Sequence, residues 1–178
     1  MNFITKQEYD ELFAKEKRLS KGRYWEGRWG YTNEVVKILE QENIESAIEI
    51  GTKELKIVQE SDVMDLNNTN CTYNWDAKET PWPIKDKQYD VLVALQVWEH
   101  LKGHQREAFK EVMRTCKMTI LSFPYKWDVA NDPIHRWIDE EKIKEWTLGV
   151  EPVKVIPIIS KHNIIKSRRS RIIYFFKF

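Results

Sequence analysis

The sequence has few cysteines and no long apolar run, and both shortages exclude classes of protein. Its two cysteines, Cys71 and Cys116, are too few for a disulfide framework and belong to no Cys-x-x-Cys pattern. The longest apolar runs, residues 91–95 and 172–176, are five residues each, far below the ~20 that a membrane-spanning helix needs. The first residues carry charges of both signs without an apolar stretch, so no signal peptide is expected. We therefore expect a reduced, cytoplasmic protein with no membrane partner.

An excess of charge of one sign is also missing. The chain has 29 basic and 28 acidic residues and a net charge of +1, so no overall field favours nucleic acid or a membrane surface. Glycine is scarce, with six residues in total, which is few for an enzyme built on phosphate-binding loops. The length of 178 residues suits a single domain over residues 1–178.

The N-terminal part predicts two helices joined by a linker. Residues 6–19 carry apolar side chains on one side and charges elsewhere, which favours an exposed helix. Residues 21–31, KGRYWEGRWGY, are aromatic, basic and interrupted by glycines, which favours a linker. A second helix is predicted to follow, with Thr32 as its N-cap and a buried stripe through Val35 and Leu39.

From residue 46 onward, strands and helices alternate. The apolar periodicity predicts strands over 46–50, 61–66, 89–95 and 117–123, and helices over 53–59 and 104–116. The segment 89–95, YDVLVAL, is typical of a strand buried on both faces of a sheet. Strands that alternate with helices predict an α/β fold with a mostly parallel sheet.

The last third of the chain predicts an addition to the edge of that sheet. A polar loop over 126–136 leads to a helix over 140–148, with Asp139 as its N-cap. Two β-rich stretches follow, 152–159 and 171–178, joined by a polar and basic turn. We expect them to form an antiparallel hairpin.

Four segments resemble the landmark motifs of class I S-adenosylmethionine-dependent methyltransferases, and they cover roughly residues 34–136. They are AIEIG (47–51), VMD (63–65), WD (75–76) and YDVLVALQVWEHL (89–101). The last of them, which closes in Glu-His-Leu, is the most specific. The resemblance implies a Rossmann-like sheet flanked by helices, S-adenosylmethionine as cofactor and methyl transfer to a small-molecule acceptor. It leans towards acceptors of sugar or surface-glycan metabolism.

The resemblance places the cofactor at the carboxyl ends of the strands, where open parallel sheets bind their ligands. Asp65 would accept hydrogen bonds from both ribose hydroxyls, and Asp76 would meet the adenine amino group. Gly51 would let the backbone approach the ligand closely. The expected cofactor contacts are Glu49, Gly51, Thr52, Asp65, Leu66, Asp76, Ala77, Leu95 and Gln96. The alternative is a plain strand–turn–strand, with Asp76 as a surface turn residue.

The loop after the 117–123 strand is expected to lie over the acceptor. His135 is the expected general base because its ordinary pKa lies near neutrality, and Tyr125 is a second catalytic candidate. Asp128 and Arg136 are expected to contact the acceptor. The alternative is that tryptophans pack this loop down while its polar residues cap the following helix.

The N-terminal segment, residues 1–31, resembles the helix and lid that many members of the family fold over the cofactor, and residues 32–178 would form the core. Trp25, Arg28 and Tyr31 are therefore expected to contact the substrate through stacking or cation–π interactions. Packing of the aromatic side chains against the core is the alternative.

The sequence departs from the family in two places. The glycine-rich turn is reduced to GTKEL (51–55), where Lys53 and Glu54 bring bulk close to the expected methionine end of the cofactor. Only residues 67–71 separate the second strand from the next candidate, which is too short for a helical crossover. The sheet is thus predicted to be trimmed on one side. A catalytically degenerate fold, kept as a binding module in a homodimer or with a heteromeric partner, is the alternative function.

Other functions are disfavoured. His100 and His104 have helical spacing, but Gly103 predicts a turn between them and no third ligand is apparent, so no metal site is expected. A nicotinamide-dependent oxidoreductase would need the Gly-x-Gly-x-x-Gly motif, which is absent. The basic run 166–171 is expected to be a solvated turn, so no nucleic-acid partner is expected; phosphate or RNA recognition there is the alternative.

Overall fold

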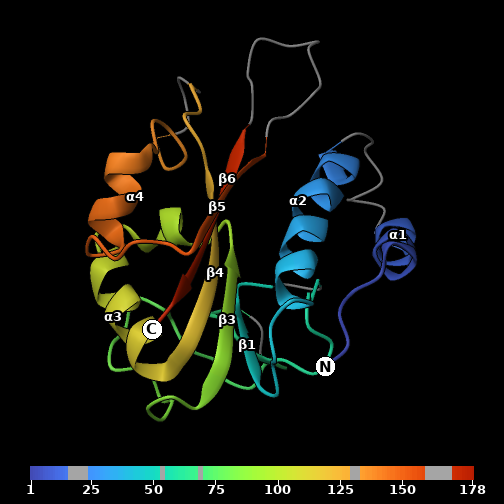
Figure 1. Ribbon diagram of the computed structural model, residues 1–178, viewed down its shortest axis with the longest axis horizontal. Coiled ribbons are helices and arrows are strands. Elements are labelled where there is room, and N and C mark those ends of the chain that lie inside the picture. Colours follow the sequence, from blue (N-terminus) through green and yellow to red (C-terminus); the bar gives the residue numbers. More distant parts are fainter. Residues whose placement is uncertain (16–23, 53–54, 68–69, 129–132, 159–169) are drawn as a thin grey trace.

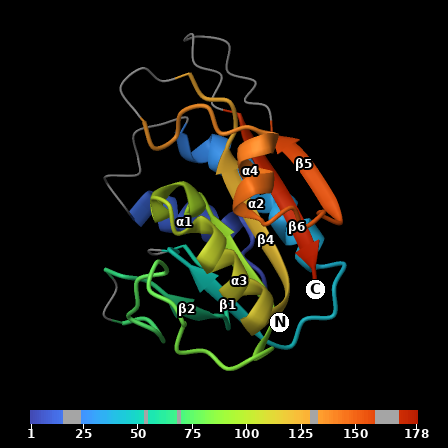
Figure 2. The same cartoon turned by 90° about the vertical axis from the view of Figure 1, so that its left-hand side faces the viewer.

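The computed structural model describes residues 1–15, 24–52, 55–67, 70–128, 133–158 and 170–178. Within these residues, one six-stranded sheet lies between helices on both faces (Figure 1). Helix α2 covers one face with α1 outside it, and α3 and α4 cover the other, in front of the sheet in Figure 2. The elements are α1 (Lys6–Lys15), α2 (Tyr24–Leu39), β1 (Ala47–Ile50), β2 (Asp62–Met64), β3 (Tyr89–Leu95), the short 3-10 helix η1 (Trp98–Leu101), α3 (Gln105–Thr115), β4 (Cys116–Pro124), α4 (Glu140–Trp146), β5 (Lys154–Ile158) and β6 (Arg171–Lys177).

The strand order is β2-β1-β3-β4-β6-β5, with the first four strands parallel. Strand β6 is antiparallel to both β4 and β5, which confirms the predicted C-terminal hairpin. The central strand β3 has the predicted bounds, and its side chains alternate between the two cores. Leu92 and Ala94 pack in the core below α3 and α4, whereas Val91 and Val93 pack in the core below α2. The fold is therefore α/β with a mostly parallel sheet, as predicted.

The sheet is trimmed beyond β2, also as predicted. Tyr73 forms a single parallel bridge with Met64. The N–H of Tyr73 donates to Val63 at 2.9 Å, and its carbonyl accepts from Asp65 at 3.1 Å. The described residues between Asp65 and Tyr73 contain no helix. Beyond β2, where a further strand could pair, the described residues thus contribute only the single bridge of Tyr73.

The linker predicted over 21–31 is wrong from residue 24 onward, where α2 begins. Thr32 is consequently no N-cap but a buried residue within the helix. Tyr31 and Leu39 are both buried in the core on this face. A glycine inside a helix costs about 1 kcal/mol, and burying one large apolar side chain contributes more than that, so packing outweighs the cost of Gly30.

The helix predicted over 53–59 is wrong in its described part. Residues 55–59 are not helical, and Val58 forms an antiparallel bridge with Phe3. The N–H groups of Ile57 and Val58 donate to the carboxylate of Glu49. Because these backbone groups are paired elsewhere, they cannot close a helical turn.

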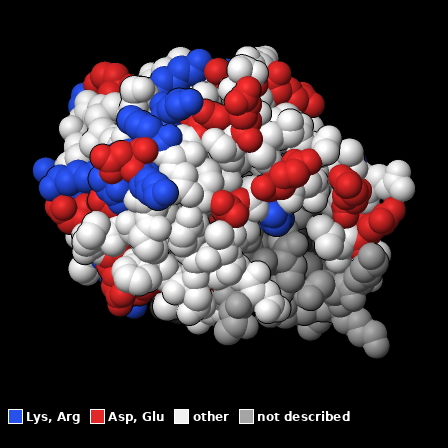
Figure 3. Space-filling view, turned by 90° about the horizontal axis from the view of Figure 1, so that it is seen from below, with Lys and Arg blue, Asp and Glu red and all other residues white. Residues whose placement is uncertain are grey.

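The remaining elements lie close to their predicted bounds. The predicted N-cap of α4 is confirmed, since the Asp139 carboxylate accepts a hydrogen bond from the N–H of Lys142 at 2.9 Å. In the part of the chain that is described, no helix combines the length and the apolar character needed to cross a membrane. On the face at the amino ends of the parallel strands, most basic side chains gather on one side with acidic ones among them, and the other side is mainly acidic (Figure 3).

Candidate functional site

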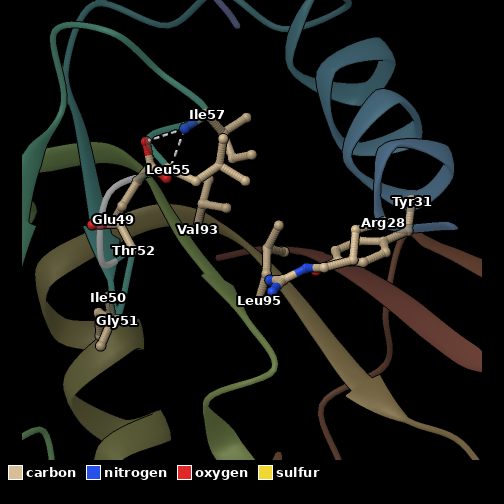
Figure 4. Close-up of a pocket in the computed structure, with 10 residues that line it drawn as sticks. All are labelled: Arg28, Tyr31, Glu49, Ile50, Gly51, Thr52, Leu55, Ile57, Val93 and Leu95. Atoms are coloured by element: carbon tan, nitrogen blue, oxygen red, sulfur yellow. Dashed lines mark hydrogen bonds between the residues drawn. The ribbon is translucent and has the colours of Figure 1, made fainter. Parts of the chain in front are cut away.

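A pocket opens where β1 and β3 end, on the α2 side of the sheet. Its cavity volume is about 30 Å³, and it is partly open to solvent. Figure 4 shows Arg28 and Tyr31 reaching from α2 towards Leu95. The lining residues are Arg28, Tyr31, Glu49, Ile50, Gly51, Thr52, Leu55, Ile57, Val93 and Leu95. Six of these, Arg28, Tyr31, Glu49, Gly51, Thr52 and Leu95, are predicted site residues, and the structure brings them together.

The turn after β1 requires glycine for reasons of backbone conformation and space. Gly51 has a φ of +68°, in the left-handed region. A Cβ at this position would lie 3.0 Å from Cγ2 of Val97, and the N–H of Gly51 donates to the carbonyl of Met64 at 3.1 Å. The backbone of this turn therefore lies close to Val97, and its predicted close approach to a ligand stays a prediction.

Glu49 forms part of the pocket wall and is almost fully buried. Its carboxylate accepts hydrogen bonds from the N–H of Ile57 at 2.9 Å, the N–H of Val58 at 2.8 Å and the hydroxyl of Ser61 at 2.9 Å. Burial raises the pKa of this carboxyl group, and the hydrogen bonds oppose that rise because they favour the ionised form. Glu49 thus fastens residues 57–61 beside β1, and its contact with the cofactor stays a prediction.

Five predicted cofactor residues lie outside this pocket: Gln96, and four residues that follow β2 in the sequence. Asp65 follows β2, and its carboxylate accepts the N–H of Asn67 at 2.8 Å. Asp76 likewise accepts the N–H of Lys78 at 3.0 Å. Leu66 is exposed and Ala77 is buried in the core below α3. The structure does not join these four residues to the Gly51 turn, and their roles stay predictions.

Gln96 follows β3 in a left-handed conformation with a φ of +59°. Its N–H donates to the carbonyl of Ser122 at 3.0 Å, and its side-chain amide donates to the Ser122 hydroxyl at 3.3 Å. Gln96 is therefore bound to the end of β4. The predicted bulky residues of the turn, Lys53 and Glu54, lie outside the described residues, as does the basic run 166–171 up to residue 169.

A series of side-chain contacts leads from the pocket to His135. Arg28 donates to the Tyr31 hydroxyl at 2.8 Å. The guanidinium of Arg171 lies 5.0 Å from the Tyr31 ring and 5.6 Å from the Trp127 ring. Trp127 in turn stacks on His135 with 5.6 Å between ring centroids. His135, the predicted base, is thus connected by side-chain contacts with Arg28 and Tyr31, the predicted substrate contacts. The connection passes through Arg171, which is buried and which the sequence analysis considered only as part of a basic run.

The other predicted acceptor residues whose side chains are described have partners in their own loop or in α4. The hydroxyl of Tyr125 donates to Glu140, and this hydrogen bond is the main reason why the pKa of Glu140 is lowered to about 2. Asp128 and Arg136 form an exposed ion pair at 3.6 Å. The side chain of Trp25 lies outside the described part of the chain. The roles of these residues in acceptor binding stay predictions.

Glu99, His100 and His135 form a cluster that the sequence analysis missed. One possible ligand atom from each lies within 4.8 Å of the other two. Oε1 of Glu99 is 3.9 Å from Nε2 of His135, and the two imidazoles meet edge to face at 5.1 Å. His104, the partner considered for His100 from its spacing, is not a member. His135 was predicted as a base, but the sequence held no signal that it would lie beside Glu99 and His100, because it comes from a separate loop.

Comparison by sequence with protein-family models and with curated proteins finds no match. Comparison of folds finds many S-adenosylmethionine-dependent methyltransferases. One from Leishmania major has a TM-score of 0.66 and 10% identity over 94% of this chain and 80% of that one. The N-methyltransferase NodS from Bradyrhizobium japonicum WM9 has a TM-score of 0.61 and 12% identity over 85% and 96%. The [4+2]-cyclase SpnF has a TM-score of 0.64 and 11% identity over 88% and 84%.

Identities this low establish similarity of fold alone. The chain therefore has the fold of S-adenosylmethionine-dependent methyltransferases, as the four sequence motifs predicted. The presence of a cyclase among its neighbours means that this fold is not tied to one reaction.

Proposed function

We propose that this protein transfers a methyl group from S-adenosylmethionine to a small-molecule acceptor. The observation that carries the proposal is a pocket at the carboxyl ends of β1 and β3, in a methyltransferase-like fold, lined by Gly51, Leu95 and Tyr31. Ligands of open parallel sheets bind at this edge. The guanidinium of Arg28 also lines the pocket and suits an anionic group such as the cofactor's carboxylate.

When bound, S-adenosylmethionine supplies an electrophilic methyl group on a positively charged sulfur. The protein contributes orientation and exclusion of water, because most of the barrier to such a transfer is lowered by holding the reacting atoms in line. The walls formed by Tyr31 and Leu95 would exclude water on the α2 side. An acceptor hydroxyl or ammonium group must also lose a proton, and we propose His135 for this task because its contact with Trp127, and through Arg171 with Tyr31, connects it with the pocket wall.

The acceptor we propose is a small polar molecule, and the resemblance of the Glu-His-Leu and His-Arg-Trp segments leans towards sugar or surface-glycan metabolism. Arg171, a buried cation, lies against both Tyr31 of the pocket wall and the indole of Trp127. Side chains of these two kinds suit an acceptor that carries negative charge or a flat ring.

A degenerate, non-catalytic fold is the second candidate, and two observations favour it. Asp65, the expected ribose ligand, accepts a hydrogen bond from its own turn at Asn67. The sheet also ends beyond β2, where a full fold would continue under the adenine. Such a protein would serve as a binding module for a second copy or another protein.

Isothermal titration with S-adenosylmethionine and S-adenosylhomocysteine separates the two candidates. We expect saturable binding of both to the wild-type chain. Leu95→Arg fills the pocket and is expected to weaken binding at least about tenfold. Val153→Arg, which adds the same side chain at an exposed position, is the matched control and is expected to bind as wild type does. Absence of binding of both ligands to a folded wild-type chain would favour the binding module.

A further inference from the structure

We propose that Glu99, His100 and His135 bind one divalent transition-metal ion beside the acceptor. Two imidazoles and one carboxylate, with positions left for solvent or substrate, form a ligand set that suits Mn²⁺, Fe²⁺, Co²⁺ or Zn²⁺. Their ligand atoms lie within 4.8 Å of one another. Two ligands of one ion stand up to about 4 Å apart when each bond is ~2.1 Å long. The 3.9 Å between Glu99 and His135 already meets this condition, and the rest of the cluster needs to contract by less than about 1 Å.

The two segments that carry the ligands are firmly held. Glu99 and His100 are neighbours in η1, whose Trp98 is buried and donates through its indole N–H to the carbonyl of Gln105 at 3.3 Å. Such anchoring matters because a metal site requires ligands placed to within a fraction of an ångström.

The loop that carries His135 is fastened on both sides of this residue. The N–H of Trp137 donates to the carbonyl of Trp127 at 3.1 Å, and the N–H of Lys126 donates to the carbonyl of Ile138 at 2.8 Å. The imidazole itself stacks on Trp127. His135 is therefore held beside η1 by the backbone of its loop and by the stacking of its ring.

Burial of Glu99 adds a reason for a cation at this place. Its side chain is 0% exposed, whereas that of His135 is 23% exposed. An ionised carboxylate in the interior is stabilised strongly by a nearby positive charge. His100 is exposed. The cluster thus runs from a buried anion to a solvent-facing imidazole, which leaves an ion a path of entry.

The site refines the proposed function and rests on it in one respect. A bound divalent ion lowers the pKa of a coordinated hydroxyl, so the acceptor atom would be an oxygen. The coordinated hydroxyl would release its proton to water, with His135 acting as a ligand of the ion in place of a base, and the oxygen would attack the methyl carbon while the sulfonium leaves as a neutral thioether.

Metal binding can be measured without cofactor or acceptor. We titrate the full chain with MnCl₂, CoCl₂ and ZnCl₂ by calorimetry and expect one ion per chain for at least one of them. His100→Ala and His135→Ala are each expected to weaken binding at least about tenfold. His104→Ala removes an exposed imidazole outside the cluster and is expected to bind as wild type does. The visible spectrum of the Co²⁺ form should lack a thiolate charge-transfer band, because neither cysteine belongs to the cluster.

Saturable binding at one equivalent with this pattern supports the site. No saturable binding of any of the three ions, or equal binding by the wild type and both histidine variants, would overturn it. S-adenosylhomocysteine binding to the metal-free chain is measured in parallel. The proposed function fails if that ligand does not bind, and the metal site fails independently if the histidine variants bind the ions unchanged.

Discussion

Trp127 and His135 stack with their ring centroids 5.6 Å apart and their planes 28° from parallel. Trp127 also contacts Arg171, whose guanidinium lies 5.6 Å from the indole ring. A single buried indole thus joins the loop after β4 to the first residue of β6. It couples the stability of the fold to the position of the residue proposed to act on the acceptor.

Replacement of this indole should affect both properties. Trp127→Ala removes a buried side chain and is expected to lower the free energy of unfolding by about 3 kcal/mol. The ring protons of His135 should also shift, because they lose the ring current of the indole. Urea denaturation and proton NMR of the histidines measure the two effects. Trp127→Phe keeps a stacked ring and should retain most of both properties; unchanged His135 resonances in Trp127→Ala would contradict the stacking.

Glu49 is predicted to stabilise the fold whether or not the protein binds a cofactor. Glu49→Ala leaves two backbone N–H groups and the Ser61 hydroxyl without their acceptor. The expected cost is about 3 kcal/mol or more, since each buried donor left unpaired costs about 1–3 kcal/mol. Urea denaturation measures it. Glu107→Ala, at an exposed position on α3, is the control and should change stability by less than about 0.5 kcal/mol. An equally small effect at Glu49 would refute the structural role.

The same substitution at two glycines should have opposite effects. Gly51→Ala places a Cβ 3.0 Å from Val97 at a φ of +68° and should destabilise the fold by about 1–2 kcal/mol. Gly30 lies inside α2, and a Cβ there meets nothing within 4 Å. Gly30→Ala should therefore stabilise by up to about 1 kcal/mol. Thermal denaturation of both variants tests the pair, and a shift of the same sign in both would be inconsistent with the geometry.

Asp90 should make stability depend on pH in the acid range. Its carboxylate accepts the N–H groups of Glu45 and Ser46 and pairs with Lys117 at 2.7 Å. Burial works against ionisation, but these hydrogen bonds outweigh it and the pKa of Asp90 falls below its usual 3.8. A lowered pKa in the folded state means that the carboxylate stabilises the fold above about pH 4 and ceases to do so as the pH falls through that pKa.

Asp90→Asn tests this sign. The variant should lose about 2 kcal/mol at pH 7, the typical worth of hydrogen bonds to a charged group. The difference between wild type and variant should shrink as the pH falls below 3.8. Urea denaturation from pH 7 to pH 2.5 measures the difference; a gap that widens towards acid would contradict the lowered pKa.

The sequence predicts those parts of the fold that depend on local periodicity. The continuous apolar run of β3 and the capped helix α4 lie where they were expected, because burial on both faces and an Asp N-cap leave direct marks in the sequence. The first half of α2 was not predicted, because its glycines and aromatic residues favour a linker locally. Burial of Tyr31 and its neighbours against the sheet decides the outcome, and that contact is long-range.

The candidate site likewise has residues whose positions could be predicted from the sequence and residues whose positions could not. Gly51 and Leu95 could be predicted because Gly51 follows β1 and Leu95 ends β3, and these two apolar strands are neighbours in the parallel sheet. The proximity of His135 to Glu99 could not, because it depends on how Trp127 folds a loop back over η1. The non-helical conformation of residues 55–59 depends similarly on Glu49, whose buried carboxylate accepts from the donors that a helix would have used.

A crystal structure of the chain with S-adenosylhomocysteine would show whether the pocket at the ends of β1 and β3 binds the cofactor. We expect the adenosyl group beside the Gly51 turn, with Tyr31 and Leu95 against it and the Asp65 carboxylate turned towards the ribose. A hollow filled by the side chain of Lys53 or Glu54, with Asp65 still bound to its own turn and the ligand absent, would contradict it.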